Sequence, residues 1–336
     1  MLRFIIRRLI QMIGVVVVLS LLLFLWLRAL PGGTVSAMLG ERATPATRAA
    51  LSQTLGLDQP VWVQYGSYVK RILGGDFGVS NGVLPGKDAV DIFLTRFPAT
   101  LELSIMAIII AVAIAIPLGY VAARRRATWF DNSTIFVSLI GVAVPVFFLA
   151  FLLKYYFALE HQWLPVSGRQ SPGIDATRVT GFFVLDGIIT QEWDAAWDAF
   201  KHLILPALAL ATIPFAVIFR ITRASVLDVM DEDFVRTAQS KGLTQRVIRG
   251  RHILRNALLP VVTTIGLQVG GLFAGAVLTE TVFSFGGIGE TLARAFQLRD
   301  YAVLQVVILA AAITYVIVNL LVDIAYALID PRVRTR

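Results

Sequence analysis

Few residues of this chain have the types and spacing that catalysis or metal binding requires. The three histidines, His161, His202 and His252, lack metal-ligand spacing, and no H-E-x-x-H pattern occurs. We interpret His161 and His202 as polar interface residues rather than ligands. The chain has no cysteine, which excludes a disulfide, a thiol nucleophile and a thiolate metal site. The sequence therefore predicts no catalytic residue and no metal site.

The glycine-rich segments also lack the context that nucleotide binding requires. The segment from Gly82 to Asp88 is nearest to a phosphate loop, but it has one residue too few between its glycines. It also places Asp88 where a Ser or Thr must reach Mg²⁺. The run from Phe285 to Gly289 lacks the strand that a dinucleotide site needs. We expect a turn at 82–88 and no nucleotide or other cofactor bound by this chain itself.

The apolar composition of the chain predicts which structural elements carry its functional residues. Of 336 residues, 57% are apolar and 15% charged, against roughly 45–50% and about 25% in soluble domains. A hydrocarbon core about 30 Å thick needs about 20 apolar helical residues. Six stretches of 17 to 23 residues lack charged residues and histidine: 9–27, 103–123, 132–153, 203–219, 257–279 and 301–322. The sequence thus predicts an all-α polytopic membrane protein with six transmembrane helices.

The first apolar stretch resembles a secretory signal in part. Arg3, Arg7 and Arg8 form a basic start, and residues 35–37 resemble a cleavage site. The apolar stretch is longer than the usual core of about 7–15 residues, and Arg28 intervenes before the site. We therefore expect this helix to be retained as the first span.

Basic residues are concentrated on one side of the predicted spans. With the N-terminus inside, the inner pieces hold 17 basic and 7 acidic residues, and the outer pieces hold 13 and 15. This asymmetry satisfies the positive-inside rule and predicts that both termini are cytoplasmic. The orientation depends mainly on Arg124 to Arg126 and on the inner loop, residues 220–256.

The inner loop has the pattern of two helices separated by a tight break. Acidic residues at 231–233 and Lys241 complement the two ends of a short helix dipole. Gly242 supplies a left-handed stop, and Thr244 is expected to cap a second helix from Gln245 to Asn256.

The first of these helices has an apolar face. Phe234 and Ala238 stand four residues apart, a spacing that suits a helix docking into a partner's groove. The alternative is a solvated connector.

Several motifs occur in a defined order along the chain. They are the run from Phe234 to Gly242 with residues 256–260 downstream, and the segments 1–8, 55–65, 75–78, 96–103, 280–283 and 330–332. This set resembles the first of the two permeases of ABC importers in the dipeptide/oligopeptide (and nickel) branch. Residues 32–34 and Gly286-Gly287 depart from that branch's pattern, outside the inner-loop motif.

The resemblance implies a type I ABC importer permease fold in a bacterial or archaeal plasma membrane. Residues 1–94 would form the first span and a long outer loop, and residues 95–336 a core of five spans. It also implies a second homologous permease, two ATPase subunits that bind ATP and Mg²⁺, and an extracytoplasmic substrate-binding protein, with membrane lipid around the spans and no nucleic acid. ATP hydrolysis is expected in the partner ATPases, so this chain is not expected to be an enzyme.

The resemblance also implies which residues act. In the family the inner-loop helix sits in a cleft of the ATPase and moves as a lever. The implied coupling residues are Phe234, Arg236, Thr237, Ala238, Lys241, Gly242, Leu243 and Pro260. Residues expected along the passage are Pro145, Phe147, Pro206, Pro214, Gln268 and Glu280. The prolines would either turn freed carbonyls to the passage or only shape the packing.

The fifth span carries glycines four residues apart, Gly266 with Gly270 and Gly271 with Gly275. This spacing predicts close helix packing.

Other functions are weighed against peptide import. The same branch includes importers of nickel complexes, glutathione and haem. An ion-coupled secondary carrier would place ionisable residues at membrane depth, whereas these spans are nearly free of them. A membrane scaffold would show no substrate-dependent change in ATP turnover.

Overall fold

The computed structural model describes residues 2–29, 35, 44–54, 59–174 and 176–329. Within these ranges the elements are helical, and the only β-type pairing is an isolated bridge between Val79 and Asp88. The predicted all-α class is therefore confirmed. The motif segments at 32–34, 36–37, 55–58 and 330–332 lie outside the described residues.

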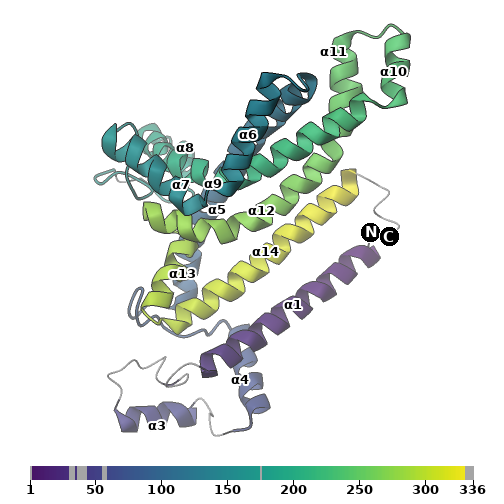
Figure 1. Ribbon diagram of the computed structural model, residues 1–336. Helices are drawn as coiled ribbons and strands as arrows, with labels where there is room; N and C mark the ends of the chain where they lie inside the picture. The colour runs from purple at the N-terminus through teal and green to yellow at the C-terminus, as the bar shows by residue number, and fades with distance from the viewer. Residues whose placement is uncertain (1, 30–34, 36–43, 55–58, 175, 330–336) are drawn as a thin grey trace. The chain divides into compact units, whose positions relative to one another are not determined.

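Figure 1 shows the α-helices, coloured in their order along the chain. Two π-helical stretches, η1 and η2, occur among them. Their bounds are α1 Leu2–Ala29, α3 Pro45–Thr54, α4 Val61–Leu73, α5 Ala89–Arg124, α6 Trp129–Ala143, α7 Val146–Leu153, η1 Lys154–Glu160, α8 Phe183–Ile189, α9 Trp193–Met230, α10 Asp233–Ser240, α11 Gln245–Val247, η2 Ile248–Leu254, α12 Arg255–Phe283, α13 Ile288–Gln297 and α14 Tyr301–Ile329.

Four helical stretches within the described ranges are long and apolar enough to cross a membrane. They are α5, α9, the run Gln245–Phe273 and the stretch Tyr301–Val322 of α14. The pair formed by α6 and the helix Val146–Glu160 qualifies only when its two parts are taken together, and the described apolar part of α1, Ile10–Trp26, is shorter. The structure thus shows several apolar helices, and the exact number of six spans stays a prediction.

Residues 132–153, predicted as one span, form two helices instead. The chain bends by 104° between α6 and the helical stretch after Pro145. Val144 has φ −80° and ψ 123°, an extended conformation. Proline disfavours a helical conformation in the residue before it and has no N–H to donate, so a helix tends to end there. Pro145 then begins the next helix as its N-cap residue.

Contacts divide the chain into two compact units. Unit 1 comprises residues 1–99 and 286–317, and unit 2 comprises residues 100–285 and 318–336. The predicted sequence domains, divided after residue 94, stay a prediction.

In unit 1, one buried carboxylate orders the loop before α5. Asp300, 1% exposed, accepts hydrogen bonds from Ser80 Oγ and from the backbone N–H groups of Gly82 (3.0 Å) and Val83 (2.9 Å). Ser80 N also donates to Lys87 O at 2.8 Å. The predicted turn at 82–88 is confirmed, and its polar groups are used to hold the loop to the start of α14.

Unit 2 is assembled around α9, which packs against α6, α7, α8 and α12. Glycines allow close approach at several crossings. A Cβ on Gly266 would overlap Val322 of α14, and a Cβ on Gly275 would lie 2.9 Å from Leu210 Cδ1 of α9. The predicted close packing is therefore confirmed at these two positions, whereas a Cβ on Gly271 would meet nothing within 4 Å.

Candidate functional site

The predicted inner-loop helix is present and ends as expected. Helix α10 begins after Glu232, and Gly242 follows it with φ +75°. Gly242 N donates to Gln239 O at 2.9 Å, and Leu243 N donates to Ala238 O at 3.3 Å. These two bonds form a Schellman motif, which satisfies carbonyls that the end of a helix leaves open. The helix–break–helix pattern is confirmed.

The second helix of the loop differs from the prediction in two ways. Thr244 occupies the N-cap position, but its side chain makes no capping hydrogen bond; its backbone oxygen accepts from Val247 and Ile248 instead. The helix then passes through the π-helical stretch η2 before α12 begins at Arg255. Such π-helical segments are rare and often occur at functional sites. The prediction of a side-chain cap by Thr244 was wrong.

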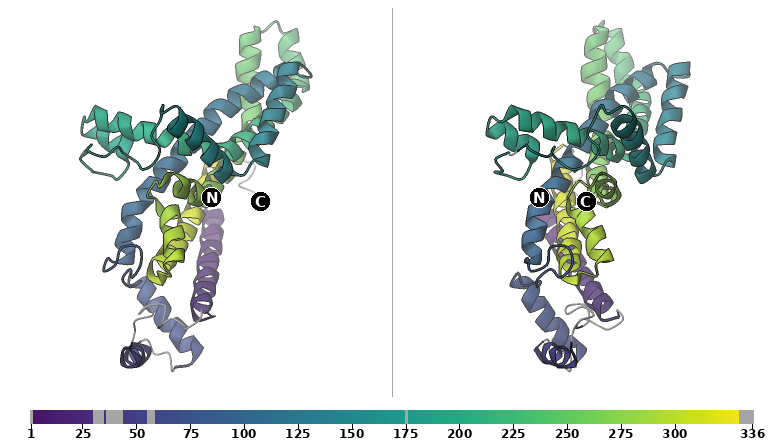
Figure 2. Two further views of the ribbon diagram at one scale, coloured as in Figure 1. Left: turned by 60° about the vertical axis from the view of Figure 1, so that its left-hand side comes forward. Right: turned by 90° about the vertical axis from the view of Figure 1, so that its left-hand side faces the viewer.

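The predicted apolar face of α10 is also placed differently. Val235 and Ala238, three residues apart, are 2% and 5% exposed, whereas Phe234 is 41% exposed. Both views in Figure 2 show α10 running beside the following helical stretch, and α10 packs on η2. The buried cluster at this contact contains Ala123, Val226, Val235, Ala238, Ile248, Ile253 and Ala257. Ala238 therefore faces the chain's own interior in this structure and is not available for an external contact.

The other predicted coupling residues are accessible. They are Phe234, Arg236, Thr237, Lys241, Gly242, Leu243 and Pro260. Arg236 lies 3.7 Å from Asp233, but these side chains are 71% and 97% exposed, and such exposed pairs contribute little to stability. The outward surface of α10 is thus an exposed mixture of one aromatic and several polar side chains on an internally packed base.

The base of this loop is clamped by contacts that sequence reasoning missed. Arg223 in α9 makes two hydrogen bonds to Asp131 in α6. Ser225 Oγ donates to Ala257 O of α12 at 2.9 Å. A single acid close to the basic residues Arg124 to Arg126 was the available signal for Asp131. Together these contacts join α9, which leads into α10, to its neighbours α6 and α12.

The predicted passage residues do not share one environment. Pro206, Pro214 and Glu280 are buried inside the chain, Gln268 is half-buried, and Pro145 and Phe147 are exposed. Helix α9 runs without interruption through both of its prolines. The Glu280 carboxylate accepts a hydrogen bond from Thr100 Oγ1. The role of these residues in a passage stays a prediction.

A polar cluster that the sequence did not predict lies near Glu280. Arg169, in the segment between η1 and α8, donates to Glu102 of α5, and both side chains are almost fully buried. In the same segment Ser171 N and Oγ donate to the two oxygens of Asp198 of α9, at 2.7 and 2.8 Å. The available signals were an acid at the edge of a predicted span, Glu102, and an arginine in the following outer loop, Arg169.

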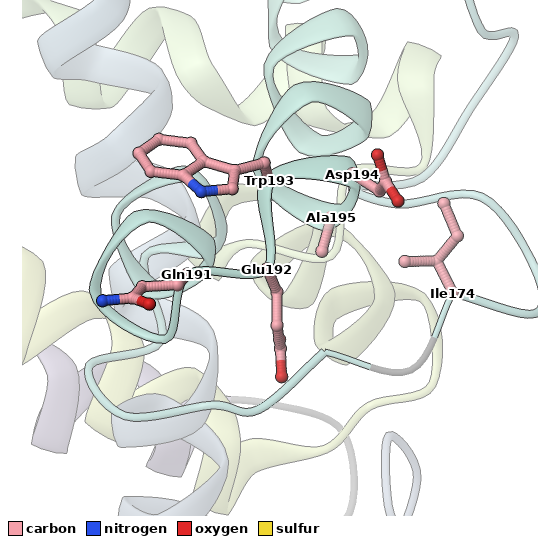
Figure 3. Close-up of a pocket in the computed structure, with 6 residues that line it drawn as sticks. All are labelled: Ile174, Gln191, Glu192, Trp193, Asp194 and Ala195. Carbon is pink, nitrogen blue, oxygen red and sulfur yellow. The ribbon is translucent and has the colours of Figure 1, made fainter.

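The start of α9 borders an open hollow (Figure 3). Its lining includes Glu192, Trp193 and Asp194. The Glu192 carboxylate accepts hydrogen bonds from the hydroxyl and N–H of Thr177, at 2.8 and 2.9 Å, and these bonds lower its pKa. Glu192 is therefore used to order the neighbouring loop. No group of three or more His, Asp or Glu within the described ranges could hold a metal ion.

Comparison with known proteins gives the family. Residues 115–335 match the model described as "Binding-protein-dependent transport system inner membrane component", and residues 1–104 match the model of its N-terminal part. The dipeptide transport system permease protein DppB of Escherichia coli K12 is 44% identical over 341 residues, covering 99% of each chain. That of Alkalihalophilus pseudofirmus is 42% identical over 334 residues, covering 99% of this chain and all of the relative.

A third relative extends the same pattern. The di/tripeptide transport system permease protein DppB of Pseudomonas aeruginosa is 45% identical over 336 residues, covering 99% of each chain. The matches thus span both the N-terminal part and the part that contains the inner loop. With its apolar helices and these full-length similarities, the chain belongs to the family of binding-protein-dependent transport system inner membrane components and is a multi-pass inner membrane permease.

Proposed function

We propose that this chain is one of two permease subunits of an ATP-driven importer of dipeptides and short oligopeptides. The observation that carries the proposal is the exposed helix α10, held on an internally packed base and ended by Gly242. The relatives are dipeptide and di/tripeptide permeases, which supports peptides as the substrate class.

In this proposal the energy comes from partner subunits. Two ATPase subunits bind ATP and Mg²⁺, and an extracytoplasmic binding protein delivers the peptide. The outward side chains of α10, Phe234, Arg236, Thr237 and Lys241, contact an ATPase on the cytoplasmic side. The positive-inside charge pattern supports that orientation.

The packing of the inner loop supports transmission of movement from the ATPase contact to the long helices. Ala238 and Val235 fix α10 to η2, and the Arg223–Asp131 pair fixes the end of α9 to α6. A displacement of α10 is then passed to long helices rather than absorbed by a loose connector. Closure of the ATPases on ATP would thereby switch the passage between inward and outward access.

The proposal is tested by reconstitution of the complete complex in liposomes, with the binding protein and a labelled dipeptide. Uptake should require ATP and persist when a protonophore is added. Loss of uptake on adding the protonophore, with ATP still present, would instead indicate an ion-coupled carrier.

A matched pair of variants tests the α10 contact. Phe234→Ala should weaken co-purification of the ATPases and uptake, because it removes the exposed aromatic side chain. Gln239→Ala, an exposed change on the same helix outside the predicted contact set, should leave both near the parent level. Equal behaviour of the two variants would contradict the assignment.

A further inference from the structure

A buried ion pair lies at the end of unit 2 that the charge pattern assigns to the outside. Arg169 Nη2 donates to Glu102 Oε2 at 2.6 Å, and the side chains are 11% and 9% exposed. Glu102 lies in α5 just before the predicted span 103–123, and Arg169 comes 67 residues later. The pair therefore joins a spanning helix to the connecting segment between η1 and α8, which the structure describes at residues 161–174 and 176–182.

The same two side chains also hold the start of α8. Arg169 Nη2 donates to Gly181 O at 2.8 Å, and Glu102 Oε1 accepts from Val184 N at 2.9 Å. The guanidinium carbon lies 3.7 Å from the centre of the Phe183 ring. Burial lowers the pKa of Arg169, and the charge of Glu102 opposes that effect. The ion pair thus ties the middle of the connecting segment and the start of α8 to α5.

The connecting segment contacts two further long helices. Gly168 N donates to Phe283 O at the end of α12, at 2.9 Å, and Ser171 is bonded to Asp198 of α9. The segment consequently bridges α5, α9 and α12. If these helices move relative to one another when the passage changes its access, at least one of the bridges must open.

The Arg169–Glu102 pair is the bridge least suited to be permanent. Arg169 Nε and the neighbouring Gln170 Nε2 are buried and have no hydrogen-bond partner within the described part of the chain. By contrast, Arg223 uses both Nε and Nη2 on Asp131. Buried donors are normally satisfied, so the contact of Arg169 with Glu102 leaves one buried donor open, whereas Arg223 uses two nitrogens on Asp131. The contrast indicates a fixed clamp at Asp131 and a releasable one at Glu102.

We propose that Arg169 is a positioning residue on the outer side of unit 2, and that its ion pair with Glu102 holds the connecting segment (161–174 and 176–182) against α5 and opens during each import cycle. This inference rests on the proposed import function. It concerns this chain's own movement, whatever the identity of the peptide.

A reversible cross-link tests whether the pair must open. The chain has no cysteine, so Glu102→Cys with Arg169→Cys introduces its only two thiols. A short bis-methanethiosulfonate reagent, applied to the reconstituted complex, should join them and lower uptake and binding-protein-stimulated ATPase activity by about tenfold, within the usual range of coupling between sites. A reductant should restore both.

The control cross-link lies in the same outer region. Thr177 Oγ1 donates to Glu192 Oε1 at 2.8 Å; Thr177 is exposed, Glu192 is half-buried, and neither belongs to α5. Joining Thr177→Cys to Glu192→Cys should leave uptake unchanged. The proposal is overturned if the Glu102–Arg169 cross-link fails to form, or if the cross-linked complex transports at the rate of its reduced form.

A second measurement separates a latch from a structural support. The double variant Glu102→Gln/Arg169→Gln removes both charges of the pair, which we call the latch. If the pair is a latch, the ATPase activity of the complex without binding protein should rise about fivefold, at the lower end of typical coupling. The single variant Arg169→Lys keeps the positive charge opposite Glu102. Its ATPase activity should therefore depend on binding protein more than that of the double variant does. Unchanged basal activity and binding-protein stimulation in the double variant would overturn the latch.

The readouts also separate this inference from the proposed function. If the complex is stimulated by its binding protein but imports no peptide, the substrate assignment fails while the ATPase measurement still tests the latch. If the parent imports peptide and the cross-link has no effect, the latch alone fails.

Discussion

Arg223 of α9 holds Asp131 of α6 with both Nε and Nη2, at 2.6 Å to Oδ1 and 2.7 Å to Oδ2, across 92 residues of chain. Asp131 is 1% exposed, and its Oδ2 also accepts the N–H of Ala127 at 2.9 Å. The Arg223 hydrogen bonds lower the pKa of Asp131, and Asp131 raises the pKa of Arg223. Since α9 leads directly into α10, this pair determines the base from which the inner-loop helix projects.

Loss of this pair should destabilise the protein. Asp131→Asn keeps the shape of the side chain but removes its charge, and should lower the free energy of unfolding by about 2 kcal/mol, because hydrogen bonds to charged groups contribute about 1.5–3 kcal/mol. The midpoint of thermal unfolding in detergent measures the effect. Asp233→Asn is the control, since Asp233 is 97% exposed and 3.7 Å from Arg236.

The pH dependence of this effect follows from the direction of the shift. The pKa of Asp131 is lowered in the folded protein, so its contribution is complete above the ordinary carboxylate value and is lost as pH falls through the lowered pKa. The difference in unfolding midpoint between the parent and Asp131→Asn should therefore be constant from about pH 6 to about pH 8. A difference that changes over this range would contradict the ion-pair explanation.

Gly242 should be required for coupling because of its backbone conformation. A Cβ there would meet nothing within 4 Å, but φ is +75°, where an L-residue costs roughly 1–2 kcal/mol and a β-branched one is especially unfavourable. Gly242→Val should displace the end of α10, abolish uptake and retain membrane insertion. Gly242→Asn should retain much of the uptake, since asparagine tolerates this conformation. If Gly242→Val transports at the parent rate, the inner loop is only a connector and its assignment to coupling is wrong.

Helix packing in unit 2 gives a further prediction. Gly266→Ala would place its Cβ into Val322 and should destabilise the protein by about 1–3 kcal/mol, the usual cost of overpacking. Val322→Ala should rescue it, because it removes the overlapping atoms. Gly271→Ala is the matched control, as a Cβ there meets no neighbour within 4 Å. Equal unfolding midpoints for the two glycine variants would show that the close approach is not required.

The predicted topology can be checked by labelling single cysteines in intact cells. Positions Asp76 and Asp194 should react with an impermeant thiol reagent from outside, and positions Arg125 and Lys241 only after the membrane is opened, as the positive-inside distribution predicts. Another outer position suggested by the sequence, Asp175, lies outside the described residues. Inside-only labelling at position 194 would overturn the six-span arrangement.

The absence of a phosphate loop from the sequence predicts that the purified chain neither binds nor hydrolyses ATP. Equilibrium binding with a labelled nucleotide analogue measures this, with the assembled complex as the positive control. Stoichiometric nucleotide binding to the chain alone would contradict the assignment of ATP to the partner subunits.

Features that depend on neighbouring residues could be predicted from the sequence. The apolar stretches predict membrane helices because every peptide group in hydrocarbon must find its partner within the helix. The stop at Gly242 was predictable because the left-handed conformation depends on a missing Cβ at that residue. The family resemblance likewise rests on ordered local motifs.

Features that depend on distant segments were decided by the tertiary structure. Residues 132–153 were predicted as one span, but the structure has two helices there with a bend of 104° between them, and α7 packs on α9 and α12. Ala238 has the same spacing from Phe234 that the helix pattern requires, yet the arrival of η2 beside α10 buries it. Glu102 meets Arg169 across 67 residues. Local propensity cannot specify such pairs, because their burial and charge partners depend on which segments the whole fold brings together.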